Sequence, residues 1–222
     1  MHTYPSYIAP SGEAIVEFVR ANPFAIVATS TAGAPVATHV PIVFQPGFEP
    51  QGTFVGETLW GHMGRDNPHW QLFAENPSTL LAFSTSHAYV SPSNYGFADA
   101  VPTLDYATVH LTGKVTIIED DALSLDVVKQ TVSHFESARS EPWEQSPSFP
   151  IYEKILPGIV AFTIEVETES AMFKLSQDMP ADVHERVVAD LTSGERKHPD
   201  VAALMRRIGV SAEAGQTDQP GI

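Results

Sequence analysis

The stretch FAIVATSTAGAPVATHV (residues 24–40) decides the fold class of this sequence. Residues 24–29 are a short apolar run rich in strand-forming residues. In residues 36–40, the strand-forming Val36, Thr38 and Val40 alternate with Ala37 and His39. The glycine and proline in residues 31–35 (TAGAP) favour a turn between the two runs. Two strand-like runs joined by a turn predict an antiparallel β-hairpin.

Strand and helix patterns follow one another irregularly along the rest of the chain. We expect further strands over residues 52–59, 79–85, 106–118, 159–166 and 171–175, and helices over residues 11–22, 67–76, 120–139, 152–156, 183–191 and 201–208. This order lacks the regular βαβ alternation of a parallel sheet, so it predicts an antiparallel α+β or barrel fold. We expect a single domain over residues 1–210 and a disordered tail over residues 211–222, where no periodicity is present.

Composition restricts the classes of protein that this chain can belong to. No apolar stretch approaches the roughly 18 residues that a membrane span needs, so we expect a soluble protein without membrane contact. The absence of cysteine agrees with the reducing cytoplasm. The formal charge is −15, and the first 113 residues contain only two basic side chains, Arg20 and Arg65. This charge argues against direct binding to nucleic acid, because the phosphate backbone would repel the protein.

Residues 61–70 (GHMGRDNPHW) form the first candidate site. Here Arg65 precedes the helix start at Asn67-Pro68, where exposed amides and a guanidinium together favour an anion. The alternative is that Arg65 neutralises Asp66 and that the two glycines shape a turn. Both interpretations stay open on the residues alone.

Three later stretches offer further ligand-binding side chains. Residues 86–95 (SHAYVSPSNY) are rich in histidine, tyrosine and hydroxyl groups, which suits a pocket or a structural corner. Residues 101–106 (VPTLDY) lead into Val109-His110 and are also typical of a plain strand start. Residues 174–178 (KLSQD) provide a cation, a hydroxyl and an amide for a phosphate, or belong to a surface loop.

No metal site and no catalytic motif is predicted. The histidines at positions 39, 62, 87 and 110 lie in or beside predicted strands, but their spacing is not that of a zinc site. No phosphate loop or Ser-His-Asp order is present. The sequence therefore leaves open whether the protein is an enzyme.

Taken together, these stretches resemble the PaiB family of FMN-binding negative transcriptional regulators. The matching motifs keep their order over residues 4–205, and they are Tyr4-Pro5, Asn22-Pro23-Phe24-Ala25, Gly33-Ala-Pro35, Thr38-His39-Val-Pro41, Gly61-His62 with Arg65, Asn67-Pro68 and Trp70, His87-Ala-Tyr89-Val-Ser91-Pro92 with Tyr95, Val101-Pro-Thr103 with Tyr106 and Val109-His110, Glu141-Pro-Trp143, Ile159-Val160 and Lys174-Leu-Ser-Gln177. Their common order is more specific than any single motif.

The resemblance implies an antiparallel six-stranded split β-barrel of the pyridoxamine-phosphate-oxidase type, with peripheral helices. It further implies a homodimer that holds FMN at the subunit interface. On the phosphate side it places Arg65, Lys174, Ser176 and Gln177. Along the rest of the pocket it places His62, His87, Tyr89, Ser91, Tyr95, Tyr106 and His110.

The sequence departs from the family pattern at three places. Asn94 stands where the family has tryptophan, Leu104-Asp105 stands for Trp-Asn, and Asp178-Met179 stands for Asn-Arg. One charge about 5 Å from a phosphate contributes roughly 3 kcal/mol at an effective dielectric constant near 20. The loss of a cation beside a new carboxylate therefore predicts a weaker hold on FMN.

Three functions are compatible with these residues. The first is a flavin-binding protein with a sensory or redox role, in which the flavin carries the electrons and the protein tunes it. The second is a transcriptional regulator that acts through a small ligand or a partner protein. The third is binding of haem or another small ligand by a barrel that has lost FMN.

Overall fold

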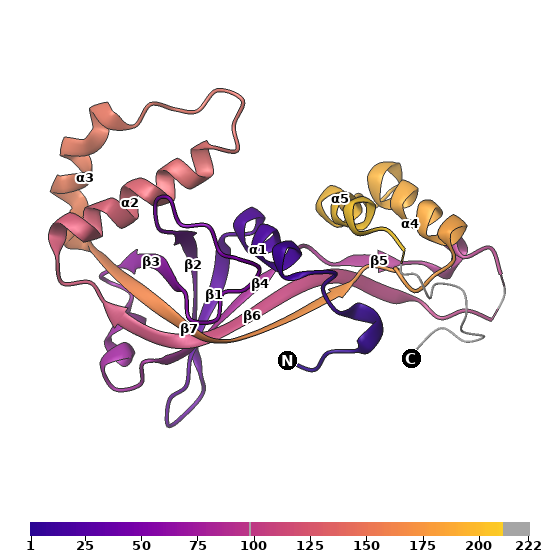
Figure 1. Cartoon of the computed structure of the whole chain (residues 1–222), viewed down its shortest axis with the longest axis horizontal. Helices are drawn as coiled ribbons and strands as arrows, with labels where there is room; N and C mark the ends of the chain where they lie inside the picture. The colour runs from indigo at the N-terminus through magenta and orange to yellow at the C-terminus, as the bar shows by residue number, and fades with distance from the viewer. Residues whose placement is uncertain (98, 211–222) are drawn as a thin grey trace. The chain divides into compact units, whose positions relative to one another are not determined.

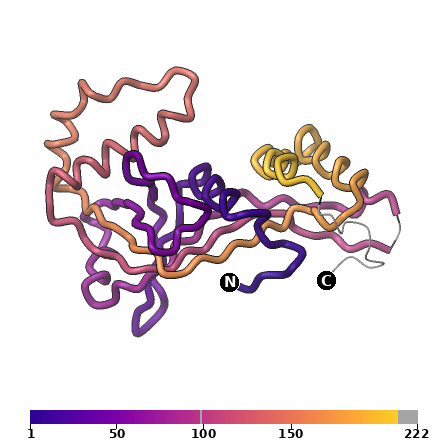
Figure 2. The backbone as a smooth tube through the Cα atoms, in the orientation of Figure 1, coloured from indigo at the N-terminus to yellow at the C-terminus, as the bar shows by residue number. Residues whose placement is uncertain are grey.

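The computed structural model describes residues 1–97 and 99–210, so the predicted disordered tail lies outside the described residues. The chain forms two compact units. We call the first the barrel unit, which comprises residues 12–83 and 110–169, and the second the hairpin unit, which comprises residues 1–11, 84–109 and 170 onward. Each unit is assembled from segments that lie far apart in the sequence (Figures 1 and 2).

Six antiparallel strands close into a barrel, as predicted. They are β1 (Phe24–Thr29), β2 (Val36–Phe44), β3 (Thr58–Gly64), β4 (Ser78–Ser84), β6 (Thr103–Ile117) and β7 (Ile159–Lys174). Their order is β4-β1-β2-β3-β7-β6, and pairing of β6 with β4 closes the circle. The predicted hairpin is confirmed, because Thr29 pairs with Val36 across the turn.

The strand predicted over residues 52–59 begins and ends later in the structure. Gly52 and Gly56 have φ angles of 73° and 86°, which interrupt an extended chain, and β3 begins only at Thr58. The glycine-rich residues 61–64 are its second half instead of a turn. Gly61 pairs with both Ile42 and Phe162, and a Cβ atom there would lie 2.6 Å from the Phe162 ring. Close packing between two strands therefore explains this glycine.

The two strands predicted over residues 159–166 and 171–175 are one continuous strand, β7. The polar residues between them resemble a loop, but they make contacts on the exposed face of the barrel. Lys114 of β6 forms an ion pair with Glu167 at 2.9 Å, and the hydroxyl of Thr112 bonds that of Thr168. Strand β6 also begins three residues earlier than the predicted strand, at Thr103.

Helices cover the barrel unit where the sequence predicts them. They are α1 (Gly12–Ala21), the 3₁₀ turn η2 (Pro68–Ala74), α2 (Asp121–Glu136) and α3 (Phe149–Ile155). The buried Val127 of α2 packs against Val43 of β2 and Trp60 of β3. Figure 1 shows α2 and α3 in the same part of this unit, and Figure 2 traces the wide loop that joins them.

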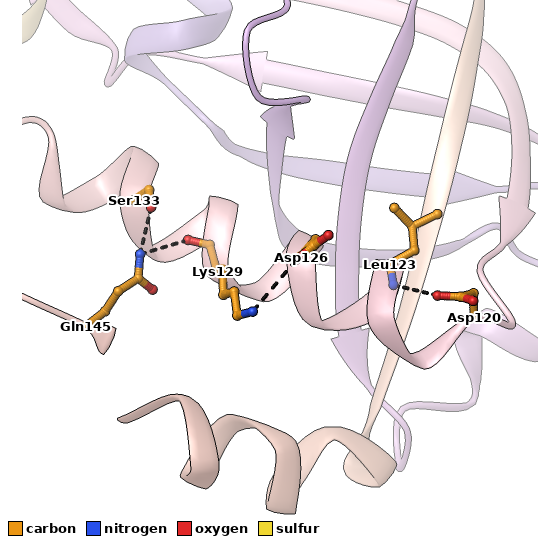
Figure 3. Close-up of polar contacts among 6 residues, drawn as sticks. All are labelled: Asp120, Leu123, Asp126, Lys129, Ser133 and Gln145. Atoms are coloured by element: carbon orange, nitrogen blue, oxygen red, sulfur yellow. Dashed lines mark hydrogen bonds and ion pairs between the residues drawn. The ribbon is translucent and has the colours of Figure 1, made fainter. Parts of the chain in front are cut away.

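Polar contacts fix both ends of helix α2 (Figure 3). At its start, the carboxylate of Asp120 accepts a hydrogen bond of 2.7 Å from the Leu123 amide, so Asp120 is the N-cap. Near its end, the side-chain amide of Gln145 donates to the Ser133 hydroxyl at 2.7 Å and to the Lys129 carbonyl at 3.3 Å. The loop after α2 is thereby held against the helix.

The hairpin unit is built on the short strand β5 (Ala88–Val90), which pairs with the first residues of β6. Helices α4 (Ala181–Ser193) and α5 (Pro199–Ile208) lie side by side (Figure 1). From α4, the guanidinium of Arg186 donates to the carbonyls of Asn94 and Tyr95 at 2.7 and 2.8 Å. This contact fixes the turn η3 (Pro92–Asn94), whose first residues Ser91 caps.

Among the residues that the structure describes, no helix is long and apolar enough to cross a bilayer. In the same residues, no group of three or more His, Asp or Glu side chains is arranged to hold a metal ion.

Candidate functional site

The predicted site residues divide between the two units. His62, Arg65 and His110 belong to the barrel unit, and the other eight belong to the hairpin unit.

Arg65 lies just after β3 and is held by backbone carbonyl groups. Its Nε donates to the Pro157 carbonyl at 2.7 Å, and its Nη2 donates to the Ile159 carbonyl at 2.9 Å. The guanidinium also lies 5.7 Å from the centre of the Trp70 ring, whose Nε1 donates back to the Arg65 carbonyl. The side chain is exposed, and an arginine has five N–H groups, so donors remain for a ligand within this fixed orientation.

The two predicted histidines of the barrel unit are half-buried and neutral. Burial lowers the pKa of His62, whose Nδ1 lies 3.5 Å from the Thr131 hydroxyl. Burial likewise lowers the pKa of His110 in β6. Both side chains therefore offer hydrogen bonds and aromatic surface at neutral pH, with no charge.

A third histidine, His69, is more deeply buried, and nothing in its sequence pattern singles it out. Its Nδ1 lies 2.8 Å from the Thr38 hydroxyl and its Nε2 lies 3.0 Å from that of Thr29. The Asn67 side chain accepts from the His69 amide at 3.0 Å, which is the predicted helix cap. A fully partnered, buried imidazole that joins strands β1 and β2 to η2 has a structural role.

In the hairpin unit, six polar side chains form one cluster. We call it the acid–tyrosine cluster, and its members are Tyr7, Tyr95, Asp105, Lys174, Ser176 and Asp178. The Ser176 hydroxyl donates to Asp105 Oδ2 at 2.6 Å, and the Tyr7 hydroxyl donates to Asp178 Oδ2 at 2.9 Å. Lys174 donates to the Thr103 hydroxyl, and its Nζ lies 5.6 Å from the centre of the Tyr7 ring.

The carboxyl group of Asp105 has a strongly raised pKa. Its side chain is fully buried, and burial raises the pKa of its carboxyl group to about 7, with the nearby Asp178 adding to the rise. The Ser176 hydrogen bond and the charge of Lys174 act in the opposite direction and lower this pKa. A substantial fraction of the Asp105 carboxyl therefore carries a proton at neutral pH.

Both tyrosines of the cluster stay protonated. Burial, followed by the charge of Asp105, raises the pKa of Tyr95 to about 12. Burial and the adjacent Asp178 likewise raise the pKa of Tyr7. Two buried polar atoms, the Tyr95 hydroxyl and Asp105 Oδ1, have no hydrogen-bond partner among the described residues.

The predicted phosphate-side residues of the hairpin unit have partners within the chain. Ser176 and Gln177 are buried, and Ser176 adopts a φ of 53°. The Gln177 side chain accepts from the Leu175 amide at 2.8 Å and donates to the Phe173 carbonyl, so it closes the turn after β7. This geometry is that of a folded corner and differs from that of an open loop.

The remaining predicted pocket residues are more exposed. His87 is exposed, Tyr106 is half-buried, and Tyr89 pairs with Leu104 on the solvent side of the hairpin. Ser91 accepts from the Ser93 amide and hydroxyl at 3.3 and 2.9 Å. The side chain of Asn94, which stands where the family has tryptophan, donates to Asp190 of α4 at 3.0 Å.

Comparisons with known proteins identify the family to which this chain belongs. The family model described as "Putative FMN-binding domain" matches residues 1–168. The chain is 34% identical over 206 residues to the "Protease synthase and sporulation protein PAI 2" of Bacillus subtilis, an alignment that covers 90% of this chain and 95% of the relative.

Similar solved structures provide evidence for the fold of this chain and for no other property. The conserved hypothetical protein Rv2991 from Mycobacterium tuberculosis superposes with a TM-score of 0.55 at 13% identity, covering 81% of this chain and 94% of that chain. The flavocytochrome Anf3 from Azotobacter vinelandii superposes with a TM-score of 0.53 at 16% identity, covering 78% and 72%.

The closed six-stranded barrel and the matched domain thus define a barrel protein of the class described as having a putative FMN-binding domain. Within this class, the chain belongs to the PaiB-like family. The predicted family and fold class are both confirmed.

Membership of this family implies FMN as a cofactor. The two groups of residues that were predicted to bind its phosphate differ in how well they suit that role. Arg65 suits this role, because hydrogen bonds to the Pro157 and Ile159 carbonyls orient its guanidinium group. Arg65 also lies within the matched residues 1–168. The segment 174–177 fits poorly, because Ser176 and Gln177 are committed to chain partners and two carboxylates accompany Lys174. That segment also lies beyond the matched residues.

Proposed function

We propose that this protein binds FMN as a homodimer, with Arg65 as the main phosphate-binding residue, and acts in the cytoplasm as a regulator controlled by its ligand. The observation that carries the proposal is the oriented guanidinium of Arg65 on a barrel whose residues match an FMN-binding domain. The dimer is part of the proposal because half of a split-barrel pocket needs a second subunit.

The chain's own residues have limited roles in this proposal. Arg65 binds and orients the phosphate, while the neutral imidazoles of His62 and His110 supply uncharged hydrogen-bonding surface in the barrel unit. When bound, FMN supplies electron-transfer chemistry. A purely regulatory role requires only that the flavin-bound and flavin-free forms differ in affinity for a partner.

FMN is expected to bind the purified protein and lose fluorescence at low micromolar concentration. Arg65→Gln should weaken FMN binding by about 10- to 100-fold, because hydrogen bonds to a charged group contribute about 1.5–3 kcal/mol. Binding of riboflavin, which has no phosphate, should be the same in both proteins. The measurement is a fluorescence titration with each flavin, with light scattering of the same samples to report the dimer.

Lys174→Gln is the matched control, since it removes the other cation predicted on the phosphate side. We expect it to change FMN affinity less than Arg65→Gln, because Lys174 has Thr103 and Tyr7 as neighbours. Equal losses of FMN and riboflavin in Arg65→Gln would assign Arg65 a structural role. No quenching of FMN at tens of micromolar by the native protein would reject flavin binding.

Regulation is proposed to occur without direct DNA contact. The formal charge of −15 opposes binding to phosphate backbones, and Arg65 is committed to the ligand. A mobility-shift assay with the isolated protein is therefore expected to show no retained DNA at physiological salt, with or without FMN. A tight complex that weakens steeply as salt is raised would contradict this route of regulation.

A further inference from the structure

The acid–tyrosine cluster joins four separate segments of the hairpin unit. Tyr7 comes from η1 (Pro5–Tyr7) near the chain start, Tyr95 follows η3, Asp105 lies in β6, and Ser176 and Asp178 lie in the turn after β7. The Tyr7–Asp178 hydrogen bond of 2.9 Å is a contact that attaches the N-terminal segment, residues 1–11, to this turn.

Asp105 lies at the centre of these contacts. Its side chain is fully buried, and among the described residues only its Oδ2 has a hydrogen-bond partner, which is Ser176. Thr103 and Asp105 lie on the same face of β6. The Thr103 hydroxyl accepts a hydrogen bond from Lys174, whose ammonium group lies over the Tyr7 ring. The charged and titratable groups that act on Asp105 are Lys174 and Asp178, and Asp105 in turn acts on Tyr7 and Tyr95.

An ionised Asp105 would be poorly stabilised in this position. Lys174, the cation of the cluster, would face two carboxylates, and one carboxylate oxygen would be buried without a donor from the described residues. An unpaired buried charge is expensive, so the ionised state favours any rearrangement that admits water. Movement of the N-terminal segment is such a rearrangement, because Tyr7 covers Lys174 and binds Asp178.

We propose that the acid–tyrosine cluster is a proton-controlled clasp, in which protonated Asp105 keeps Tyr7 and the N-terminal segment closed and ionised Asp105 releases them. On release, the proton passes from the Asp105 carboxyl group to water and the carboxylate becomes hydrated. The clasp lies wholly within the hairpin unit and does not depend on flavin binding. It would make the order of residues 1–11 depend on pH near neutrality.

Two measurements on the full-length protein test the clasp together. Infrared spectroscopy should show a protonated carboxyl band that disappears as the pH rises through about 7. Hydrogen exchange of amides in residues 1–11, corrected for the intrinsic rate at each pH, should show opening that increases about 30-fold from pH 5.5 to pH 8.5. This factor assumes that the opened carboxyl has its ordinary pKa of 3.8.

Asp105→Asn should remove both the infrared band and the pH dependence of opening, because it keeps the shape and cannot ionise. Glu185→Gln is the matched control: it removes one exposed acid of α4 and should leave both signals unchanged. Tyr7→Phe should increase opening at every pH while the infrared band remains. A band that persists in Asp105→Asn, or opening that is independent of pH in the native protein, would overturn the clasp.

Discussion

Asp105→Asn is expected to increase the free energy of unfolding by about 4 kcal/mol at pH 8. The pKa of this buried carboxyl is raised from 3.8 to about 7, and a difference of one in pKa between the folded and unfolded states corresponds to about 1.4 kcal/mol. The folded state holds the Asp105 proton more tightly than the unfolded state does. The protein therefore takes up a proton at this carboxyl group when it folds at a pH between 3.8 and about 7. The stability that the Asp105 proton contributes is therefore fully present below pH 3.8, decreases as the pH rises toward 7, and is lost above it.

Urea unfolding at several pH values measures this effect. Below pH 4 the native protein and Asp105→Asn should have nearly the same stability, and the difference should grow as the pH rises to 7. The side-chain carbonyl of asparagine can still accept the Ser176 hydrogen bond, so this contact of the native state is kept. A variant that is less stable than the native protein at pH 8 would show that the ionised carboxylate is well compensated.

Gly113→Ala is expected to lower the free energy of unfolding by about 3 kcal/mol or more and the melting temperature by about 10 °C. Gly113 lies in β6, and a Cβ atom there would lie 2.1 Å from the backbone oxygen of Glu165 in β7. Since the clash is with backbone, a side-chain rotation cannot relieve it, and the two strands must separate locally. Calorimetry or thermal unfolding followed by circular dichroism measures the change.

Gly64→Ala is the control for this substitution. It also places a methyl group on a barrel strand, but nothing lies within 4 Å of the new Cβ atom. We expect its melting temperature to stay within about 2 °C of the native value, since alanine is tolerated in an extended strand. Similar losses in both variants would show that the strand β6 contact is not the cause.

The sequence predicts the barrel well because its strands are short apolar runs bounded by turn residues. Strand β1 and the first hairpin follow from residues 24–40 alone. The errors arise where tertiary contacts override local pattern. Gly61 and Gly64 belong to β3 despite the turn-like composition around them, and the polar centre of β7 stays extended because Lys114 and Thr112 of β6 contact it.

The candidate site was predictable only in part. Arg65 stands out in the sequence as an isolated cation, and its role in anion binding stays a prediction. The acid–tyrosine cluster could not be assembled from sequence, because its members are separated by up to 171 residues along the chain. The departures at Asp105 and Asp178 are visible in the sequence as two unrelated changes, and only the fold shows that the charge of Asp178 acts on Asp105.

The interleaving of the two units limits how this chain can be divided. Four chain crossings, after residues 11, 83, 109 and 169, separate the barrel unit from the hairpin unit. No single cut in the gene therefore yields either unit as an intact fragment, and neither can be exchanged with a relative as a simple cassette. Strands β6 and β7 each contribute residues to both units, so a deletion within either strand would alter both.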